Sequence, residues 1–326
     1  MKYLVFWVCL LFILGCDSPS KPIPTFLHDL KSAPYPWTVP LKQNKGNDFS
    51  FIIISDLNGG ERQGVFASAV EQINRLNPVF TISVGDLIDG GTKDTLLLEK
   101  QWTSFNQRAS KFNAPFFYVG GNHDLTNAEM RAYWEATIGP SYYHFVYNNV
   151  LFLILNSEDF DSEQLERIFN ARAEALKILS GEKEGVYTET EYFKMPERSF
   201  GAMSTDQLNY FTSVLNQYNK VQWTFVFMHK PLWKNEESKT FKNLEKILAM
   251  RNYSVFNGHE HSFSYKRRNQ QSYTTLGTTG GSQNTSDPNA FDHISWVSLQ
   301  DKPYVTHLRL DGVLDETGKS LTPKIE

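Results

Sequence analysis

The sequence predicts an α/β fold, because short apolar runs alternate with segments of helical periodicity and several of these runs are uninterrupted. Uninterrupted runs such as FIII (51–54) and FTISV (80–84) are typical of strands that are buried on both faces. The chain has 326 residues, of which 40% are hydrophobic and 14% aromatic, enough for one large globular domain or two small ones. The net charge of -4 gives no basic footprint for nucleic acid as a partner.

The first sixteen residues, MKYLVFWVCLLFILGC, contain one early lysine followed by an apolar run. The run is short for a membrane span and is typical of a signal-peptide core. Its end, Ile13 to Cys16, resembles the lipobox of bacterial lipoproteins, in which the residue that matches Cys16 becomes lipidated. A plain secretory signal and an N-terminal anchor helix remain as alternatives. We therefore expect a signal peptide over 1–15, a lipidated Cys16 with a tether over 16–48, and a membrane-anchored location in the cell envelope, with the leaflet undetermined.

The chain contains only two cysteines, Cys9 and Cys16. With the signal removed and Cys16 acylated, the mature domain has no free thiol and no disulfide. A cysteine nucleophile and a thiolate metal ligand are therefore excluded. Within the tether, Tyr35 and Trp37 are the residues expected to pack onto the domain, and the folded part should begin near Phe49.

The expected elements follow the apolar pattern in order. Strand 49–54 comes first, and helix 61–77 follows with apolar residues at helical spacing from Val65 to Leu76. After strand 78–84, helix 94–112 and strand 114–120, the sequence TNAE (126–129) predicts a capping box that opens helix 126–138. A hairpin over 143–155 should turn at Asn148-Asn149.

The second half continues this alternation and ends in strands. Helix 162–179 is followed by helix 204–218, which STDQ (204–207) opens as a second capping box. Strand 221–228, helix 241–250 and strand 253–257 come next, and residues 273–310 contain three strands. The pattern therefore predicts an α/β chain with a β-rich C-terminal part.

Polar side chains with metal-binding capacity follow five of the buried strands. In open α/β sheets ligands bind at the carboxyl ends of strands, so these side chains should gather at one point. Taken singly, each has an ordinary structural explanation, such as a helix cap, a turn or a core histidine. Five such ends at equivalent positions make that explanation untenable. The residues concerned are Asp56 and Asn58; Asp86 and Asp89; Asn122, His123 and Asp124; His229; and His259 with His261.

The residue types indicate the class of metal. Carboxylate, amide oxygen and imidazole without thiolate suit Mn²⁺, Fe or Zn²⁺. There are more candidate ligands than one ion needs, and two ions roughly 3.5–4 Å apart can clamp an in-line displacement at phosphorus. The other four histidines, which fit no such pattern, are expected to be structural: His28, His144, His293 and His307.

The motifs GDLID (85–89), GNHD (121–124) and GHEH (258–261), in this order and with Asp56 and His229, resemble the calcineurin-like metallophosphoesterase family. The hairpin YYHFVYNNVLFLILNSE (142–158) resembles that family's central hairpin, and the likeness extends over about residues 49–310. The resemblance implies a four-layer αββα sandwich of two mixed β-sheets flanked by helices.

The resemblance also implies a role for each matching residue and two divalent metal ions, Mn, Fe or Zn. A hydroxide between the metals would attack phosphorus in line. His123 would protonate the leaving group and Asp124 would orient His123. Asp89 would be a structural residue next to the ligands and would not itself bind a metal. The implied ligands are Asp86 for both metals; Asp56 and His261 for the first; and Asn122, His229 and His259 for the second.

One position departs from the family pattern. The family usually has Asp-x-His at the first motif, whereas this chain has Asn58 in place of the histidine. An asparagine offers a carbonyl oxygen, which is a harder and weaker ligand than imidazole. Asn58 is therefore a candidate ligand that binds the first metal directly, through water or not at all.

Two further features leave alternatives open. The segment 158–201 is longer than the family's usual connection, and it is either a surface excursion or a lid over the site. Arg62 is either a phosphate contact or a solvated residue at a helix start. The phosphoesterase domain is expected over 49–312, with a C-terminal tail at 313–326.

The sequence therefore predicts an exported, lipid-anchored, dinuclear metal-dependent hydrolase of a phosphate mono- or diester, whose substrate is a small molecule or a cell-envelope component. The oligomeric state stays open. The alternative is a non-catalytic or weakly active binding lipoprotein on the same fold, with a first metal site degraded by Asn58. A zincin or a serine hydrolase is disfavoured, because neither HExxH nor GxSxG occurs.

Overall fold

The computed structural model describes residues 26–42 and 48–310. The expected signal peptide, Cys16, the start of the tether and the tail 313–326 lie outside this part of the chain. Within it, no helix is both long enough and apolar enough to cross a membrane.

Two β-sheets form the centre of the molecule. The first has five strands in the order β12-β11-β2-β3-β4. Its strands β2, β3 and β4 run parallel, whereas β11 pairs antiparallel with both β2 and β12. The bounds are β2 Phe49–Ile54, β3 Phe80–Ser83, β4 Phe116–Phe117, β11 His293–Leu299 and β12 Pro303–Arg309.

The second sheet has seven strands in the order β1-β5-β6-β7-β8-β10-β9. Strands β6, β7, β8 and β10 are parallel neighbours, and β1, β5 and β9 pair antiparallel at the two edges. The bounds are β1 Phe26–Leu27, β5 Tyr143–Tyr147, β6 Val150–Ile154, β7 Trp223–Phe227, β8 Tyr253–Asn257, β9 Ser264–Arg268 and β10 Gln271–Thr275.

The two sheets pack face to face through phenylalanines. Phe51 and Phe80 of the five-stranded sheet meet Phe152 of the seven-stranded sheet edge to face, with ring centroids 5.4 Å apart in both pairs. Edge-to-face pairs add stability beyond the apolar area that they bury. This aromatic layer fixes how the two sheets pack against each other.

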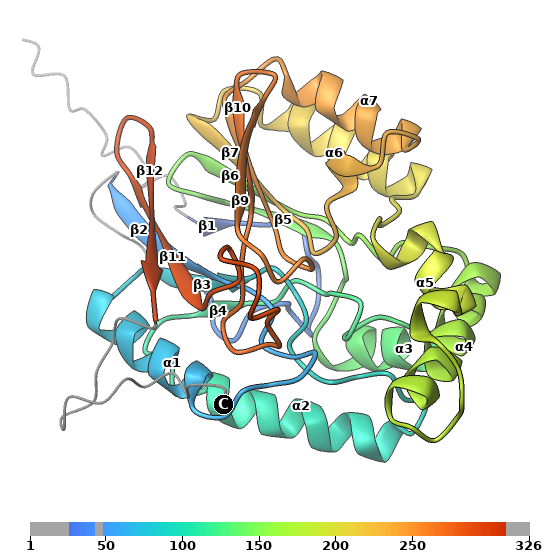
Figure 1. Ribbon diagram of the computed structural model, residues 1–326. Coiled ribbons are helices and arrows are strands. Elements are labelled where there is room, and N and C mark those ends of the chain that lie inside the picture. Colours follow the sequence, from blue (N-terminus) through green and yellow to red (C-terminus); the bar gives the residue numbers. More distant parts are fainter. Residues whose placement is uncertain (1–25, 43–47, 311–326) are drawn as a thin grey trace, which may run out of the picture.

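Helices cover the outer faces of both sheets, and together the layers confirm the expected four-layer αββα sandwich. The apolar sides of α1, α2 and α3 pack on the five-stranded sheet, and those of α6 and α7 pack on the seven-stranded sheet. In Figure 1, α1 and α2 lie below the sheets and α6 and α7 lie above them. The bounds are α1 Val65–Leu76, α2 Thr95–Ala109, α3 Ala128–Thr137, α6 Thr205–Gln217 and α7 Lys239–Leu248.

Local signals in the sequence account for most of the element ends. The hairpin turns at Asn148 and Asn149, both with positive φ, as a two-residue turn that matches the strand twist requires. Ser204 caps α6 by accepting from the amide of Gln207. The box at 126–129 is wrong by one position, because Asn127 is the N-cap of α3, and the Thr126 hydroxyl donates to the Asn122 carbonyl instead.

Part of the expected tether belongs to the folded body. Trp37 is only 5% exposed, and its ring lies 5.5 Å from that of Phe117. Tyr35 stacks on Trp37 with the ring planes 9° apart, and β1 extends the seven-stranded sheet beside β5. The expected packing of Tyr35 and Trp37 is thus confirmed, but the ordered fold includes residues 26–42 and does not begin at Phe49.

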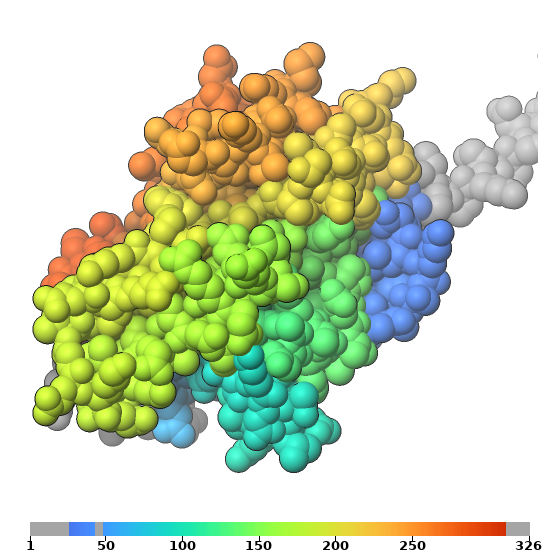
Figure 2. Space-filling model, turned by 90° about the vertical axis from the view of Figure 1, so that its right-hand side faces the viewer, coloured from blue at the N-terminus to red at the C-terminus, as the bar shows by residue number. Residues whose placement is uncertain are grey.

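The long segment 158–201 folds as a helical excursion on one side of the sandwich. It contains α4 (Ser162–Leu179) and α5 (Glu191–Lys194), with the 3-10 turns Tyr187–Glu189 and Pro196–Arg198. A small apolar cluster, which includes Ile168 and Met195, holds the segment together. In Figure 2 its yellow-green surface forms much of the face toward the viewer.

Candidate metal centre

The predicted site residues come from the strand ends of both sheets. Asp56, Asp86 and Asn122 follow β2, β3 and β4, whereas His229 follows β7 and the 259–261 loop follows β8. Backbone bonds tie the loops together: the amide of Asp56 donates to Gly85 and that of Gly258 to His229. The expectation of a single sheet end is therefore corrected, since two stacked sheets with converging carboxyl ends build the site.

Four of these residues adopt left-handed backbone conformations. Asp56 and Asp86 have φ of 45° and 58°, and His259 and His261 have φ of 76° and 53°. A non-glycine residue in this region costs of the order of 1–3 kcal/mol and persists where the surrounding structure enforces it. Clustering of such residues at one point is typical of functional sites, where the strain aims side chains inward.

The first cluster consists of Asp56, Asp86 and His261, whose potential ligand atoms all lie within 4.8 Å of one another. His261 Nε2 is 3.3 Å from Asp56 Oδ1. The other ring nitrogen of His261, Nδ1, donates to the carbonyl of Ser282 at 2.6 Å. This bond places a proton on Nδ1, so Nε2 is the ring nitrogen that faces the carboxylates and is available to a metal ion.

The second cluster shares Asp86 and lies deeper in the molecule. His229 Nε2 is 3.1 Å from Asp86 Oδ2 and 3.0 Å from Asn122 Oδ1, while its Nδ1 donates to the carbonyl of Val84. His259 is held in the opposite sense, because its Nε2 donates to the carbonyl of Arg198 and leaves the lone pair on Nδ1. The rings of His229 and His259 are 5.1 Å apart. Asp86 thus joins two groups of ligand atoms.

This donor set fits divalent metals. In both His229 and His261 one ring nitrogen donates to a backbone carbonyl and the other faces acceptor oxygens, so the arrangement is stabilised by positive charge, either a proton on that nitrogen or a metal ion between it and the oxygens. Burial alone would lower the pKa of each of these histidines, but the neighbouring carboxylates outweigh it and raise both values to about 9. Burial would likewise raise the pKa of Asp86, yet His229 and His123 hold it well below its usual value. The site therefore favours bound positive charge.

His123 is aimed into the same pocket by a backbone contact. Its Nδ1 donates to the carbonyl of Asp89 at 2.7 Å, and its Nε2 accepts from Arg172 of α4 at 3.2 Å. Burial lowers the pKa of His123, and the guanidinium of Arg172 acts in the same direction, against the charge of Asp86. The ring is thus neutral, with the lone pair on Nε2.

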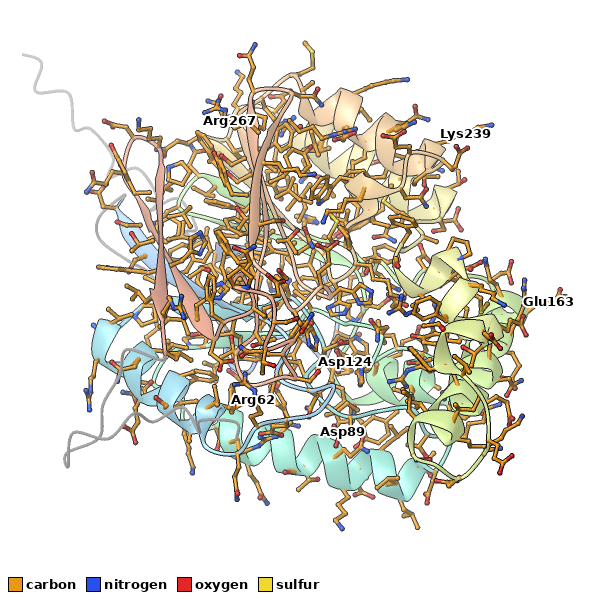
Figure 3. All side chains as sticks on the ribbon, in the orientation of Figure 1. Arg62, Asp89, Asp124, Glu163, Lys239 and Arg267 are labelled. Carbon is orange, nitrogen blue, oxygen red and sulfur yellow. The ribbon has the colours of Figure 1, made fainter. Side chains whose placement is uncertain are left out.

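The expected orientation of His123 by Asp124 is wrong, because the Asp124 carboxylate is turned toward the backbone. One oxygen accepts from the amides of Asp86 and Gly121, and the other accepts from those of Leu87 and Ile88. Figure 3 shows Asp124 near the centre of the molecule, with Asp89 between it and α2. Burial, followed by the charge of Asp86, raises the pKa of Asp124 to about 7. Asp124 therefore shapes the loop that carries Asp86, and Asp89 is the residue that holds His123.

Asn58 is buried, and its side-chain amide contacts the loop that follows β3. Its amide nitrogen donates to the carbonyl of Leu87 at 2.5 Å. The side chain lines a separate pocket of about 270 Å³, together with Leu87, Asp89 and Gln101. The role of Asn58 as a ligand stays a prediction, and the structure gives its amide a structural partner.

Arg62 occupies neither of the two positions expected for it. Its guanidinium pairs with Asp292 and donates to the carbonyl of Gly281, and only 14% of the side chain is exposed. This ion pair ties the loop before α1 to the loop that follows β10. Arg62 is therefore neither a phosphate contact nor a solvated residue.

Four of the predicted metal ligands, Asp86, Asn122, His259 and His261, line a pocket of about 730 Å³, and the 158–201 segment forms one wall. This segment contributes Arg172 and Arg198 close to these ligands, and Leu176, Leu179, Tyr187 and Tyr192 farther along the wall. Sequence reasoning missed both arginines. A signal for Arg172 exists, since it falls four residues after Ile168 and seven after Leu165, on the face of α4 that is otherwise buried.

Comparison with known proteins identifies relatives of this architecture. The family model described as calcineurin-like phosphoesterase matches residues 49–263. The serine/threonine-protein phosphatase CPPED1 of Rattus norvegicus is 34% identical over an alignment of 142 residues that covers 37% of this chain and 44% of that protein. The Mus musculus protein of the same name is 36% identical over an alignment of 115 residues that covers 31% of this chain and 35% of that protein. The chain thus spans less than half of these curated relatives.

Two solved structures share the fold at low sequence identity. A dimetal phosphatase from Danio rerio superposes with a TM-score of 0.57 and 16% identity, covering 80% of this chain and 96% of that chain. The structure of PhoD superposes with a TM-score of 0.54 and 9% identity, covering 87% of this chain and 75% of that chain. These likenesses agree with the four-layer sandwich.

Proposed function

Because the chain belongs to the calcineurin-like phosphoesterase family, we propose that it hydrolyses a phosphate mono- or diester with the help of two divalent metal ions. The observation that carries this proposal is the pair of clusters joined at Asp86. In each cluster a histidine donates from one ring nitrogen to a backbone carbonyl and faces acceptor oxygens with the other nitrogen. Such a set is suited to metal binding and is hard to explain as core packing.

The two clusters suggest which residues would hold each ion. Asp56 and His261 would bind the first ion, and Asn122, His229 and His259 would bind the second, with Asp86 shared. Asn58 would contribute the oxygen of its side-chain amide to the first ion, while the nitrogen of the same amide keeps its bond to Leu87. When bound, two such ions supply a nucleophile that is available at neutral pH, and they neutralise the charge that develops on the phosphate.

The chain itself would position and protonate the reacting groups. The Asp89 carbonyl holds Nδ1 of His123, so Nε2 is the atom that would face the leaving oxygen, and it could donate a proton there only after it has been protonated and has released its contact with Arg172. Asp124 would keep the Asp86 loop rigid through its four amide contacts. The 158–201 wall would limit the access of water and would contact the leaving group.

The substrate is proposed at the level of a phosphate ester. The pocket volume of about 730 Å³ admits a small molecule or a side chain presented on a surface. The curated relatives are named as serine/threonine-protein phosphatases, which supports an ester of phosphate with an alcohol as one candidate. A small metabolite and a cell-envelope component are the other classes to test.

Removal of the shared carboxylate tests this proposal. Asp86→Asn should lose nearly all Mn²⁺-dependent activity on p-nitrophenyl phosphate and bis(p-nitrophenyl) phosphate, and should retain less metal after dialysis. Asp206→Asn, which removes an exposed carboxylate from α6, is the matched control and should behave like the wild type. Wild-type protein that binds no divalent metal, or an Asp86→Asn variant that keeps full activity, would refute the proposal.

We also propose export and lipid anchoring through Cys16, which rests on the apolar run and the lipobox-like sequence that follows it. Cys16→Ser should move the protein from the membrane fraction to the soluble fraction and abolish metabolic labelling with a fatty acid. Unchanged fractionation together with absent lipid label in the wild type would contradict the anchor.

A further inference from the structure

Arg172 occupies a position that the predicted metal site does not explain. It lies on α4, outside every motif that resembles the family, and yet it lines the pocket beside the predicted ligands. Its Nη2 is 3.2 Å from Nε2 of His123. The guanidinium therefore lies within hydrogen-bond distance of the ring nitrogen that would face the leaving oxygen.

Within residues 26–42 and 48–310, Arg172 forms no ion pair. Arg62, Arg108 and Arg167 each pair with a carboxylate, whereas Arg172 donates to the neutral ring of His123. The half-buried guanidinium of Arg172 would be repelled by the two proposed divalent ions. This repulsion is unfavourable unless an anion lies between the guanidinium and the ions. The arrangement thus provides an anion site with cations on two sides.

The loop opposite makes room for this guanidinium. A Cβ on Gly91 would lie 2.8 Å from Nη1 of Arg172, and one on Gly90 would collide with the carbonyl of His123. Both glycines have positive φ, so a side chain is disfavoured there on two counts. The absence of side chains at Gly90 and Gly91 therefore leaves the space that the His123 backbone and the Arg172 guanidinium occupy.

We propose that Arg172 is a phosphate-binding residue that makes the site prefer phosphate monoesters over diesters. The proposal rests on the phosphoesterase function above and names the substrate class that the site selects. A monoester at neutral pH has three non-bridging oxygens and up to two negative charges, whereas a diester has two such oxygens and one charge. Planar guanidinium donors match the extra charged oxygen of the monoester. In a diester, a second ester group would take that place and offer no charge.

The neighbouring Arg198 differs from Arg172 in its contacts. Its guanidinium lies 4.7 Å from the centre of the Phe193 ring, and its carbonyl accepts from His259 Nε2. Arg198 is thus already engaged in packing and in holding a predicted ligand. Arg172 is the better placed of the two to move from His123 to a phosphate oxygen.

The test compares Arg172→Gln with Arg167→Gln, which removes the same charge from the same helix outside the pocket. For Arg172→Gln, kcat/KM on p-nitrophenyl phosphate should fall roughly 10- to 100-fold, the range for a hydrogen bond to a charged group. The loss on bis(p-nitrophenyl) phosphate should be less than about threefold, and Arg172→Lys should lie between. The Arg167→Gln values should match the wild type. Equal losses on both esters, or no loss on either, would overturn the proposal.

A binding measurement separates this proposal from the function on which it rests. Inorganic phosphate is titrated calorimetrically into Mn²⁺-loaded protein, and Arg172→Gln should bind it at least tenfold more weakly than wild type and Arg167→Gln. If the wild type hydrolyses neither ester, the function fails, but a selective loss of phosphate binding still supports Arg172 as an anion site. Equal phosphate binding by all three proteins, or no binding by the wild type, overturns the role of Arg172.

Discussion

A buried ion pair attaches the 158–201 segment to the core, and breaking it should destabilise the protein in a pH-dependent way. Lys230 Nζ lies 2.8 Å from Glu158 Oε2 and also donates to the carbonyl of Glu197. The two side chains are only 2% and 3% exposed. Lys230→Met keeps the aliphatic stem and removes the ammonium, so the Glu158 carboxylate is left buried without its cation.

The magnitude follows from what the variant can do about that charge. Breaking a buried pair from one side typically costs about 3–5 kcal/mol. The variant can instead fold with a protonated Glu158. The cost is then the free energy of protonating a glutamate carboxylate of the unfolded chain, about 3.7 kcal/mol at pH 7 and about 1 kcal/mol at pH 5. The lost bond to the Glu197 carbonyl adds roughly 1 kcal/mol at either pH. We therefore expect a loss of about 5 kcal/mol at pH 7 that shrinks to about 2 kcal/mol at pH 5.

The sign of this pH effect is opposite for the reciprocal variant. Lys230→Met takes up a proton on folding, so its stability relative to wild type rises as the pH falls. Glu158→Gln leaves a buried ammonium that must lose its proton, so its relative stability rises as the pH increases. Lys230→Met/Glu158→Gln carries neither charge and should recover much of the loss at pH 7.

Urea unfolding of the metal-free proteins at pH 5, 6 and 7 measures these free energies. Lys177→Met is the control, because Lys177 pairs with Glu174 on the surface of α4 and its loss should cause no measurable change. A Lys230→Met loss below about 1 kcal/mol at pH 7 would refute the argument. So would a loss that does not vary with pH.

Three further predictions concern the site and the core. Gly121→Ala would place a Cβ 2.3 Å from Asp86 Oδ1, so the ligands must shift. We expect a roughly 100-fold loss of kcat and weaker Mn²⁺ binding in a metal titration. Unchanged Mn²⁺ affinity would contradict this. Asn58→His should raise the metal retained after dialysis by adding an imidazole to the first cluster, and equal metal content would show that the position does not face the ion. Burial lowers the pKa of His293 to about 3 and that of His307 to about 4, so the folded state excludes protons that the unfolded chain binds, and stability should fall as the pH drops below about 6.5. Between pH 7.5 and 5.5 each histidine should account for roughly 1.4 kcal/mol in urea unfolding, and His293→Asn/His307→Gln should flatten this slope; an unchanged slope would refute the assignment.

The sequence predicted the elements whose apolar residues follow a clear pattern along their length. Strand β2 matches the expected range 49–54 because its apolar run is nearly continuous, and helix α4 matches 162–179 because its buried residues recur at helical spacing and Asp161 caps it. Strand β9 was missed, since SYKRR lies at a sheet edge and has almost no buried side chain to produce a pattern. Strand β1 is only two residues long and gives no periodicity at all.

The ligand types of the candidate site were predictable, but their orientation was not. Motif spacing predicts which side chains gather at the strand ends, since a strand end places its next residues at the sheet edge. The tautomer of each histidine depends instead on a carbonyl contributed by a distant or unremarkable residue: Val84, Asp89, Arg198 and Ser282. A backbone carbonyl has no residue signature, so no pattern in the sequence could reveal these four contacts.

These carbonyls also connect the helical excursion to the metal centre. The Arg198 carbonyl holds His259, and the carbonyl of the preceding residue, Glu197, accepts from Lys230, which directly follows His229. The excursion is thus bonded to one predicted ligand and to the chain neighbour of another, and Arg172 of α4 contacts His123. A surface excursion without a role in the site would not need contacts of this kind from separate parts of its chain. Loosening it through Lys230→Met should therefore weaken metal retention as well as stability, which distinguishes a wall that supports the ligands from one that only covers them.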